Sequence, residues 1–283
     1  MSDMDIKLED LMREQFSRAK YWWGLAALSR FLIVVLGAVS VFFGNLAIGL
    51  AVFSALLSIG YVLIQWHSDH LKGIANNILR KVEMHNGLGW AITGREISEV
   101  FLSLSKSVKN RIKDSSIREI SKDYYSSKTP QSPKRLLENL VESAWLTKHQ
   151  ANRMSLYVAV FSIGLVFVTF FVLALALSTA LNQATGENIA KVAISVFAFV
   201  FSGGYVRLAF EYGRYSRDAE RLEERATSML TENEDISEYQ AIKLLHDYQI
   251  VRAGAPLLPD WLWRMMETEL NELWLKYRQS ELA

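Results

Sequence analysis

The densest group of chemically active side chains is a basic run in the middle of the chain. Its members are Lys106, Lys109, Arg111 and Lys113, followed by Tyr124, Tyr125, Lys134 and Arg135. Basic side chains neutralise phosphates, and aromatic rings stack on bases. We therefore interpret these residues as a binding site for a nucleotide or a short single strand. The alternative is a solvated charged face, or contact with anionic lipid head groups.

Hydroxyl side chains recur every seven residues at Ser155, Ser162 and Thr169, which places them on one face of a helix. Such a face can line a water-filled path, because hydroxyl groups solvate ions without trapping them. It can equally mark a contact between helices, as small residues do in membrane bundles. Gly203 and Gly204, further along the chain, are expected to form a kink or hinge.

Catalytic and metal-binding patterns are weak. In the stretch His67-Ser-Asp69-His70, the two histidines could share a helix face, but the sequence places no third strong ligand beside them and contains no cysteine. There is no phosphate-binding loop, dinucleotide fingerprint or nucleophile elbow. We therefore expect no metal, no cofactor and no enzymatic activity.

Two long runs without Asp, Glu, Lys or Arg, Phe31 to Ser68 and Met154 to Gly186, decide the class of protein. The first is long enough for two membrane spans joined by a turn at Gly44 and Asn45. The second supplies a third span, to about residue 181. A fourth, at 189–210, fits if Lys191 and Arg207 extend outward to the membrane surfaces. The expected fold is an all-α membrane protein with two transmembrane hairpins, that is, four spans.

Basic residues flank the predicted inner ends of the spans, whereas the outer turns offer Lys191 alone. By the positive-inside rule, both termini and the central segment face the cytoplasm. The spans contain no ionisable group between their flanking charges, which argues against an ion-coupled transporter. We expect a multi-pass protein of a plasma membrane.

The chain divides on this basis into five parts. They are an N-terminal amphipathic helix (1–28), hairpin one (29–66), a basic central segment (67–152), hairpin two (153–210) and a C-terminal segment (211–283). The two long polar segments should form a helical cytoplasmic domain, with helices over 97–112, 214–229, 236–251 and from Asp260 to about 277. Residues 69–153 carry 15 basic and 9 acidic side chains, whereas 207–283 carry 10 and 15. Opposite charge favours their packing on each other.

Two local stretches accompany this layout. Tyr124-Tyr125 leads through Pro133 and Asn139-Leu140 to a span, and Tyr248-Gln249-Ile-Val-Arg252 precedes Pro256-Leu-Leu-Pro259-Asp260-Trp261. With four spans and cytoplasmic termini, the chain resembles the four-transmembrane-helix pore-forming effectors encoded beside nucleotide-signal synthases in bacterial (CBASS-like) antiphage operons. The stretches cover about a fifth of the chain, and none is a catalytic signature.

The resemblance implies a channel-like antiviral effector in the bacterial inner membrane. Its gate would respond to a cyclic or linear nucleotide messenger made by a partner nucleotidyltransferase, and its opening would disrupt membrane integrity. Four helices enclose little water, so a pore implies a homo-oligomer, with a tetramer as the working number. Two other interpretations stay open: a membrane-anchored scaffold without a pore, and a lipid-modifying enzyme using His67 and His70.

Overall fold

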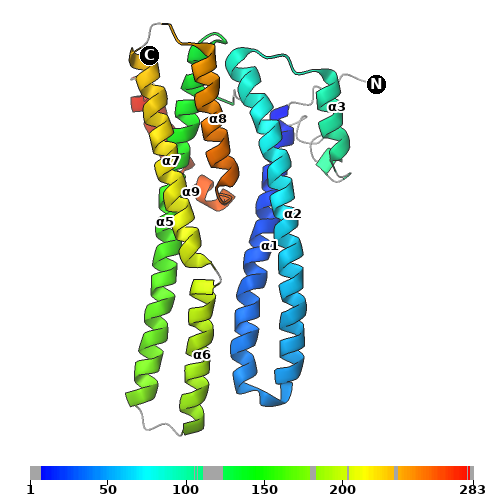
Figure 1. Cartoon of the computed structure of the whole chain (residues 1–283), viewed down its shortest axis with the longest axis vertical. Coiled ribbons are helices and arrows are strands. Elements are labelled where there is room, and N and C mark those ends of the chain that lie inside the picture. The colour runs from blue at the N-terminus through cyan, green and yellow to red at the C-terminus, as the bar shows by residue number, and fades with distance from the viewer. Residues whose placement is uncertain are drawn as a thin grey trace. The chain divides into compact units, whose positions relative to one another are not determined.

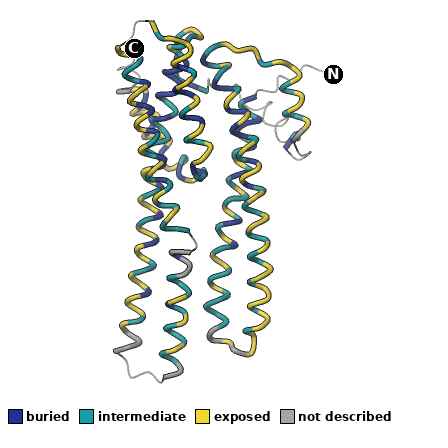
Figure 2. The backbone as a smooth tube through the Cα atoms, in the orientation of Figure 1, coloured by how far each residue is buried: buried dark blue, intermediate teal, exposed yellow. Residues whose placement is uncertain are grey.

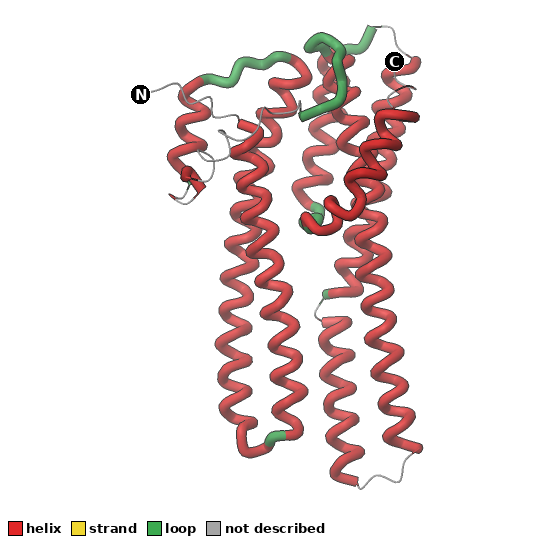
Figure 3. Tube along the Cα trace, turned by 180° about the vertical axis from the view of Figure 1, so that it is seen from behind, coloured by secondary structure: helices red, strands yellow, loops and turns green. Residues whose placement is uncertain are grey.

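The computed structural model describes residues 8–104, 106, 108–110, 124–178, 183–202, 204–232, 235–278 and 280. All regular elements in this part of the chain are helical, as Figure 3 shows. They are α1 (Leu8–Phe42), η1 (Gly44–Leu46), α2 (Ala47–Leu88), α3 (Gly94–Ser103), α5 (Pro133–Ser178), α6 (Gln183–Ser202), α7 (Tyr205–Glu232), α8 (Glu238–Gly254), α9 (Asp260–Leu273) and a π-helical turn, η2 (Trp274–Arg278). The all-α prediction is confirmed.

Three of these helices are long and apolar enough to cross a membrane: α1, α2 and α5, with 35, 42 and 46 residues. Large apolar side chains point outward from them, such as Ile48, which is 83% exposed, and Phe167, which is 69% exposed. Figure 2 shows this pattern as long stretches of exposed and intermediate residues on these helices. These three candidate spans indicate a multi-pass membrane protein.

The chain forms two compact units. The apolar unit consists of Tyr21–Ser68 and Asn152–Gly213, and the polar unit consists of Met1–Lys20, Asp69–Ala151 and Arg214–Ala283. Four helices, α1, α2, α5 and α7, contribute residues to both units. Both α2 and α5 thus continue without a break from the apolar unit into the polar unit.

Within the apolar unit, α1 and α2 run antiparallel and side by side (Figure 1). The short 3-10 helix η1 joins them at Gly44 and Asn45, where the sequence predicts the turn. The helix expected over 189–210 differs from the structure, because α6 begins at Gln183 and ends at Ser202. Gly204 interrupts the path to α7 with a φ of +80°, a conformation that glycine adopts without steric cost.

Two large clusters of buried apolar side chains lie among the described residues of the polar unit, beside a smaller one at Ala151, Tyr215 and Ala255. In the first, Leu136, Leu137 and Leu140 of α5 pack with residues of α7, α8 and η2, among them the buried Tyr248. The second joins the start of α1 to the second half of α2, and its members include Leu11, Ile78 and Val82. Long amphipathic helices build both large clusters, because each buries the apolar stripe that its sequence carries.

The ends of three helices test the sequence interpretation. The helix expected over 97–112 ends at Ser103, because Leu104 adopts an extended backbone and buries its side chain in the second cluster. Ser237 occupies the N-cap of α8, as expected. Pro259, not Asp260, occupies the N-cap of α9, and Asp260 forms an ion pair with Lys20 at 2.5 Å.

Gly87, near the end of α2, permits a close approach between α2 and the first turn of α5. A Cβ atom at this position would lie 2.3 Å from Cδ1 and 3.0 Å from Cα of Leu136. The Ser132 amide also donates to the Gly87 carbonyl at 2.8 Å. The first turn of α5 is therefore held directly against α2.

We expect Gly87→Ala to lower the free energy of unfolding by about 1–3 kcal/mol, because the new methyl group meets backbone that cannot move aside easily. Thermal unfolding in detergent, followed by circular dichroism, measures the change. Gly73→Ala is the matched control in the same helix, since nothing lies within 4 Å of its Cβ position. Equal melting temperatures for the two variants would contradict the close contact.

Candidate functional site

A loop of the polar unit, residues 124–132, carries the two predicted tyrosines and is fixed to α5 by hydrogen bonds. Ser126 donates from its backbone N and its Oγ to Glu142, at 2.9 and 2.8 Å. Ser127 Oγ donates to Glu138 at 2.5 Å, and the Trp274 indole donates to Ser126 Oγ at 2.7 Å. Because α5 supplies two carboxylates one turn apart, the loop has a defined conformation that places Tyr124 and Tyr125.

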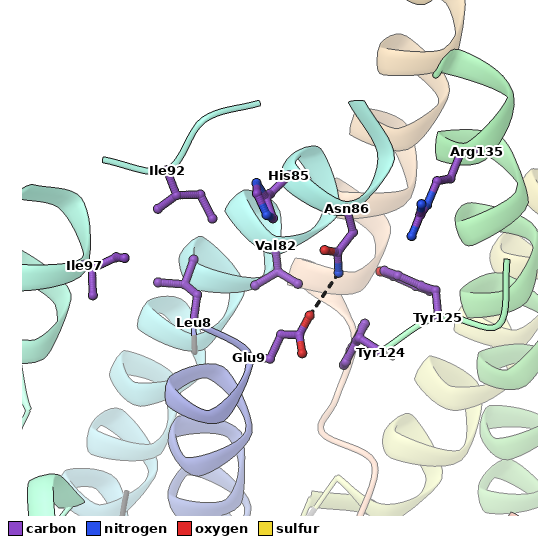
Figure 4. Close-up of a pocket in the computed structure, with 10 residues that line it drawn as sticks. All are labelled: Leu8, Glu9, Val82, His85, Asn86, Ile92, Ile97, Tyr124, Tyr125 and Arg135. Atoms are coloured by element: carbon purple, nitrogen blue, oxygen red, sulfur yellow. Dashed lines mark hydrogen bonds between the residues drawn. The ribbon is translucent and has the colours of Figure 1, made fainter. Parts of the chain in front are cut away.

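The tyrosines line a cavity of about 440 Å³, a volume within the range of small-molecule sites. Figure 4 shows its lining, which comes from α1, α2, α3, α5 and the loops between them. The lining residues are Leu8, Glu9, Val82, His85, Asn86, Ile92, Ile97, Tyr124, Tyr125 and Arg135. We call this space the tyrosine cavity.

The aromatic part of the tyrosine cavity is ordered by ring contacts. The rings of Tyr124 and Tyr125 meet edge to face, with centroids 4.7 Å apart. The Arg13 guanidinium of α1 lies 5.6 Å from the centroid of the Tyr124 ring, within range of a cation–π contact. Burial raises the pKa of Tyr124 to about 12 and the pKa of Tyr125 well above its ordinary value. Both phenols therefore stay protonated at neutral pH and can donate hydrogen bonds.

Charged and amide groups surround the rings. Arg135 donates from Nη1 to the Thr129 carbonyl at 3.0 Å, while its Nε is buried without a partner among the described residues. Asn86 donates to Glu9 at 3.1 Å, shown dashed in Figure 4. A cation, two rings and a carboxylate–amide pair match a ligand that has an anionic group, an aromatic ring and hydrogen-bond donors.

The structure separates the predicted ligand-binding residues into two groups. Tyr124, Tyr125 and Arg135 line one cavity, whereas Lys134 beside them is exposed and does not line it. Lys106 is exposed, and Lys109 lies over the Phe101 ring with its ammonium 5.2 Å from the centroid. Neither lysine lines the tyrosine cavity. Arg111 and Lys113 lie outside the described residues.

The predicted hydroxyl stripe lies inside the apolar unit. Ser162 is 4% exposed and Thr169 is 6% exposed. Their hydroxyls donate to the carbonyls of Val158 and Leu165, four residues earlier, at 2.8 and 2.7 Å. Ser155 donates to the carbonyl of Ala209 at 2.8 Å. All three hydroxyls are satisfied by backbone within the unit, which favours the helix-contact interpretation for the conformation seen.

The glycine pair lies where α6 gives way to α7. Gly204 is at the break, and a Cβ atom there would lie 3.7 Å from Nη1 of Arg30; Gly203 lies outside the described residues. Arg30 donates to the Tyr61 hydroxyl, and its guanidinium lies 4.7 Å from the centroid of that ring. Arg30 is thus held inside the apolar unit by α2. The role of Gly204 as a hinge stays a prediction.

His67 and His70 are the candidate metal ligands, and His67 makes an aromatic contact. The His67 ring packs edge to face on Trp22, with centroids 5.1 Å apart. Within the described ranges, no three His, Asp or Glu side chains lie close enough together to hold a metal ion. His85, a residue that the sequence interpretation did not assign to a site, lines the tyrosine cavity with its Nδ1 2.9 Å from the Trp90 carbonyl.

Sequence reasoning missed a buried ionic cluster between α2 and α8. Glu83 is 3% exposed and accepts from Arg252 Nη1 at 2.5 Å, from Arg252 Nη2 at 3.0 Å and from Gln249 Nε2 at 2.8 Å. Glu83 lies one residue from Val82 of the tyrosine cavity. The available signal was a lone acidic residue within an apolar helical stripe, which indicates burial but does not name the partner.

The buried phenols should make stability fall at alkaline pH. An unfolded tyrosine has a pKa of about 10, whereas the folded Tyr124 has a pKa of about 12. Below about pH 10 both states are protonated and the stabilisation is complete; above it the unfolded state ionises first, so the free energy of unfolding decreases up to about pH 12.

Denaturant unfolding in detergent across this pH range measures the slope. Tyr124→Phe should make the slope shallower because the ring stays and the titrating proton is removed. Tyr239→Phe is the control, since that side chain is 74% exposed. Indistinguishable slopes for wild type and Tyr124→Phe would contradict the burial of the phenol.

Comparisons of the chain with protein-family models, with curated proteins and with solved structures find no match. The function of the tyrosine cavity is therefore argued from its own geometry. Its rings, cation and amide–carboxylate pair lie in the polar unit of a chain with three candidate membrane spans. The tyrosine cavity is thus a candidate ligand site in a chain with three candidate membrane spans.

Proposed function

We propose that the protein is a homo-oligomeric membrane pore that opens or closes when a nucleotide or short oligonucleotide binds its polar unit. The tyrosine cavity carries this proposal, because it combines two rings with an Arg135 Nε that has no partner among the described residues, in a chain with three candidate spans. Rings accept bases by stacking, and guanidinium groups bind phosphate.

In this proposal α6 is the fourth span. Its 20 residues correspond to a rise of roughly 30 Å, the thickness of the hydrocarbon core. Its two charged residues, Glu187 and Lys191, lie in its first half, where they can reach the outer surface. Both termini and the polar unit then face the cytoplasm, in accordance with the basic residues that flank the inner ends.

The oligomer is supported by the surface of α2. None of the 18 residues in its most apolar stretch is buried within the chain. Such a helix contacts lipid on all exposed sides or packs against another subunit. A ring of identical subunits satisfies closed cyclic symmetry and creates the central path that one protomer lacks.

Coupling between ligand and pore follows from shared helices. Because α1, α2, α5 and α7 contribute to both units, a ligand that moves α5 at Arg135 acts on the helix that carries Ser155, Ser162 and Thr169. These hydroxyls line the conductive path when they exchange their carbonyl partners for water. The helix break at Gly204 allows α6 to move while α7 stays in the polar unit.

The physiological role is bacterial antiphage defence in this proposal, with a messenger supplied by a nucleotidyltransferase and loss of membrane integrity as the outcome. This role is proposed from the resemblance to pore-forming effectors, which rests on the layout of the spans and on the stretches 124–140 and 248–261. A pore-free scaffold would keep the same fold. A lipid-modifying enzyme would depend on His67 and His70, so activity that survives substitution of both histidines would argue against it.

Flux from liposomes that contain the purified protein tests the pore, with a panel of cyclic and linear oligonucleotides as ligands. We expect one ligand to change the flux. Replacing Tyr124 and Arg135 together with Ala should weaken the response about tenfold or more, since stacking on one ring contributes about 1–3 kcal/mol. Lys134→Ala, next to Arg135 but outside the cavity, should respond normally.

Two results would contradict this assignment. Ligand-independent flux or no flux with any ligand would remove the gated pore. An unchanged response of the Tyr124/Arg135 variant, together with a lost response when Lys106, Lys109, Arg111 and Lys113 are replaced with Ala, would move the ligand to the basic run.

A second prediction separates the pore from the scaffold. Replacing Ser162 and Thr169 with Leu should reduce flux strongly, because the larger side chains block a path that the hydroxyls line. Ser195→Leu on α6 is the control, because Ser195 is partly exposed and its hydroxyl donates to the Lys191 carbonyl of the same helix. Normal cellular activity of the Ser162/Thr169 variant, if the protein is folded, would favour the scaffold.

A further inference from the structure

Two adjoining recesses of the polar unit lie between α2 and α8, and the larger extends to α3. Their volumes are about 460 and 830 Å³. Both are lined by Asn77, Arg80, His246 and Gln249, so one ligand can occupy the two together. We call the pair the α2–α8 groove. Of its lining residues, Ile92 is the one that also lines the tyrosine cavity.

The smaller recess contains buried polar atoms that lack partners. Asn76 is 9% exposed, and its Oδ1 accepts no hydrogen bond from the described residues. Arg252 uses Nη1 and Nη2 for Glu83, while its buried Nε donates to nothing in the described part of the chain. An unsatisfied buried donor or acceptor is destabilising, so an occupant with one acceptor and one donor is favoured here.

Arg80 is an exposed cation of the groove, and no carboxylate of the described residues forms an ion pair with it. Its side chain lines both recesses. The neighbouring cations are engaged: Lys72 donates to the carbonyls of Ala253 and Ala255 at 2.8 and 2.5 Å, and Lys81 pairs with Glu96 at 2.7 Å. Arg80 is therefore a groove cation with which an anion can pair.

The larger recess is mostly apolar and presents an aromatic face. Trp90 is 51% exposed at its edge, and its carbonyl lies 2.9 Å from Nδ1 of His85, which fixes the backbone after α2. Ile78, Val100 and Leu245 contribute aliphatic surface. This recess suits a flat ring, whereas the smaller recess suits a charged and hydroxylated group.

We propose that the α2–α8 groove binds a nucleoside phosphate. The phosphate contacts Arg80 and accepts from Arg252 Nε, a sugar hydroxyl donates to Asn76 Oδ1, and the base lies against Trp90 in the larger recess. This site is separate from the tyrosine cavity and stands on different residues. It gives the polar unit a second nucleotide-type ligand whether or not the protein forms a pore.

Calorimetric titration of the full-length protein in detergent tests the proposal with adenosine monophosphate, inorganic phosphate and adenosine as probes. We expect adenosine monophosphate to bind most tightly, because only it fills both recesses. Arg80→Ala should weaken its binding about tenfold or more, since a hydrogen bond to a charged group contributes about 1.5–3 kcal/mol. Lys243→Ala, an exposed lysine on α8 outside the groove, should bind as wild type does.

Two further variants separate the recesses. Trp90→Ala should weaken the binding of adenosine monophosphate and leave the binding of inorganic phosphate unchanged. Asn76→Leu, which roughly keeps the size of the side chain, should weaken the binding of adenosine monophosphate and of adenosine but leave the binding of phosphate unchanged. A matching titration with a short-chain phosphatidylglycerol distinguishes a lipid phosphate from a soluble one. Tighter binding of the lipid than of adenosine monophosphate would overturn the assignment of a nucleoside phosphate as the ligand.

The assignment is overturned if Arg80→Ala and Lys243→Ala bind adenosine monophosphate equally. It is also overturned if replacement of Tyr124 and Arg135 abolishes that binding, since the ligand would then occupy the tyrosine cavity. That second result would support the proposed function while removing the groove. Conversely, groove binding in a protein that shows no flux would sustain this site and contradict the pore.

Discussion

The buried carboxylate of Glu83 is the interaction on which the polar unit depends. In a low-dielectric interior a carboxylate is stable only when it is paired and hydrogen-bonded, and Arg252 and Gln249 supply all three of its observed bonds. The cluster therefore fixes the register between α2 and α8. Residues near Glu83 on α2 line both candidate sites: Val82 and Asn86 line the tyrosine cavity, and Arg80 lines the α2–α8 groove.

Local patterns in the sequence predicted most of the fold. Long uncharged runs and helical spacing identified the spans, and Gly44-Asn45 identified the turn between α1 and α2. The end of α3 at Ser103 was not predictable, because the apolar period continues past it and Leu104 leaves the helix for a tertiary reason. The Glu83–Arg252 pair was equally hidden, since its members are 169 residues apart.

The candidate site was predicted in part for a similar reason. Tyr124, Tyr125 and Arg135 lie within one short stretch, so their proximity follows from the loop that joins them to α5. Glu9 and Asn86 meet only because α1 packs on α2. The lysines of the basic run could not be assigned to a cavity from sequence, because a cluster of lysines is also typical of a solvated surface. Lys109 instead covers the ring of Phe101.

The bare surface of α2 has a thermodynamic consequence. Because none of its most apolar 18 residues is buried within its own chain, contacts between subunits of the proposed oligomer would compete there with lipid chains of the same polarity. Association then draws on shape and close packing, without the hydrophobic drive that operates in water. In the proposed oligomer, the degree of assembly then depends on the ratio of protein to lipid in the membrane, and dilution with lipid favours separate subunits.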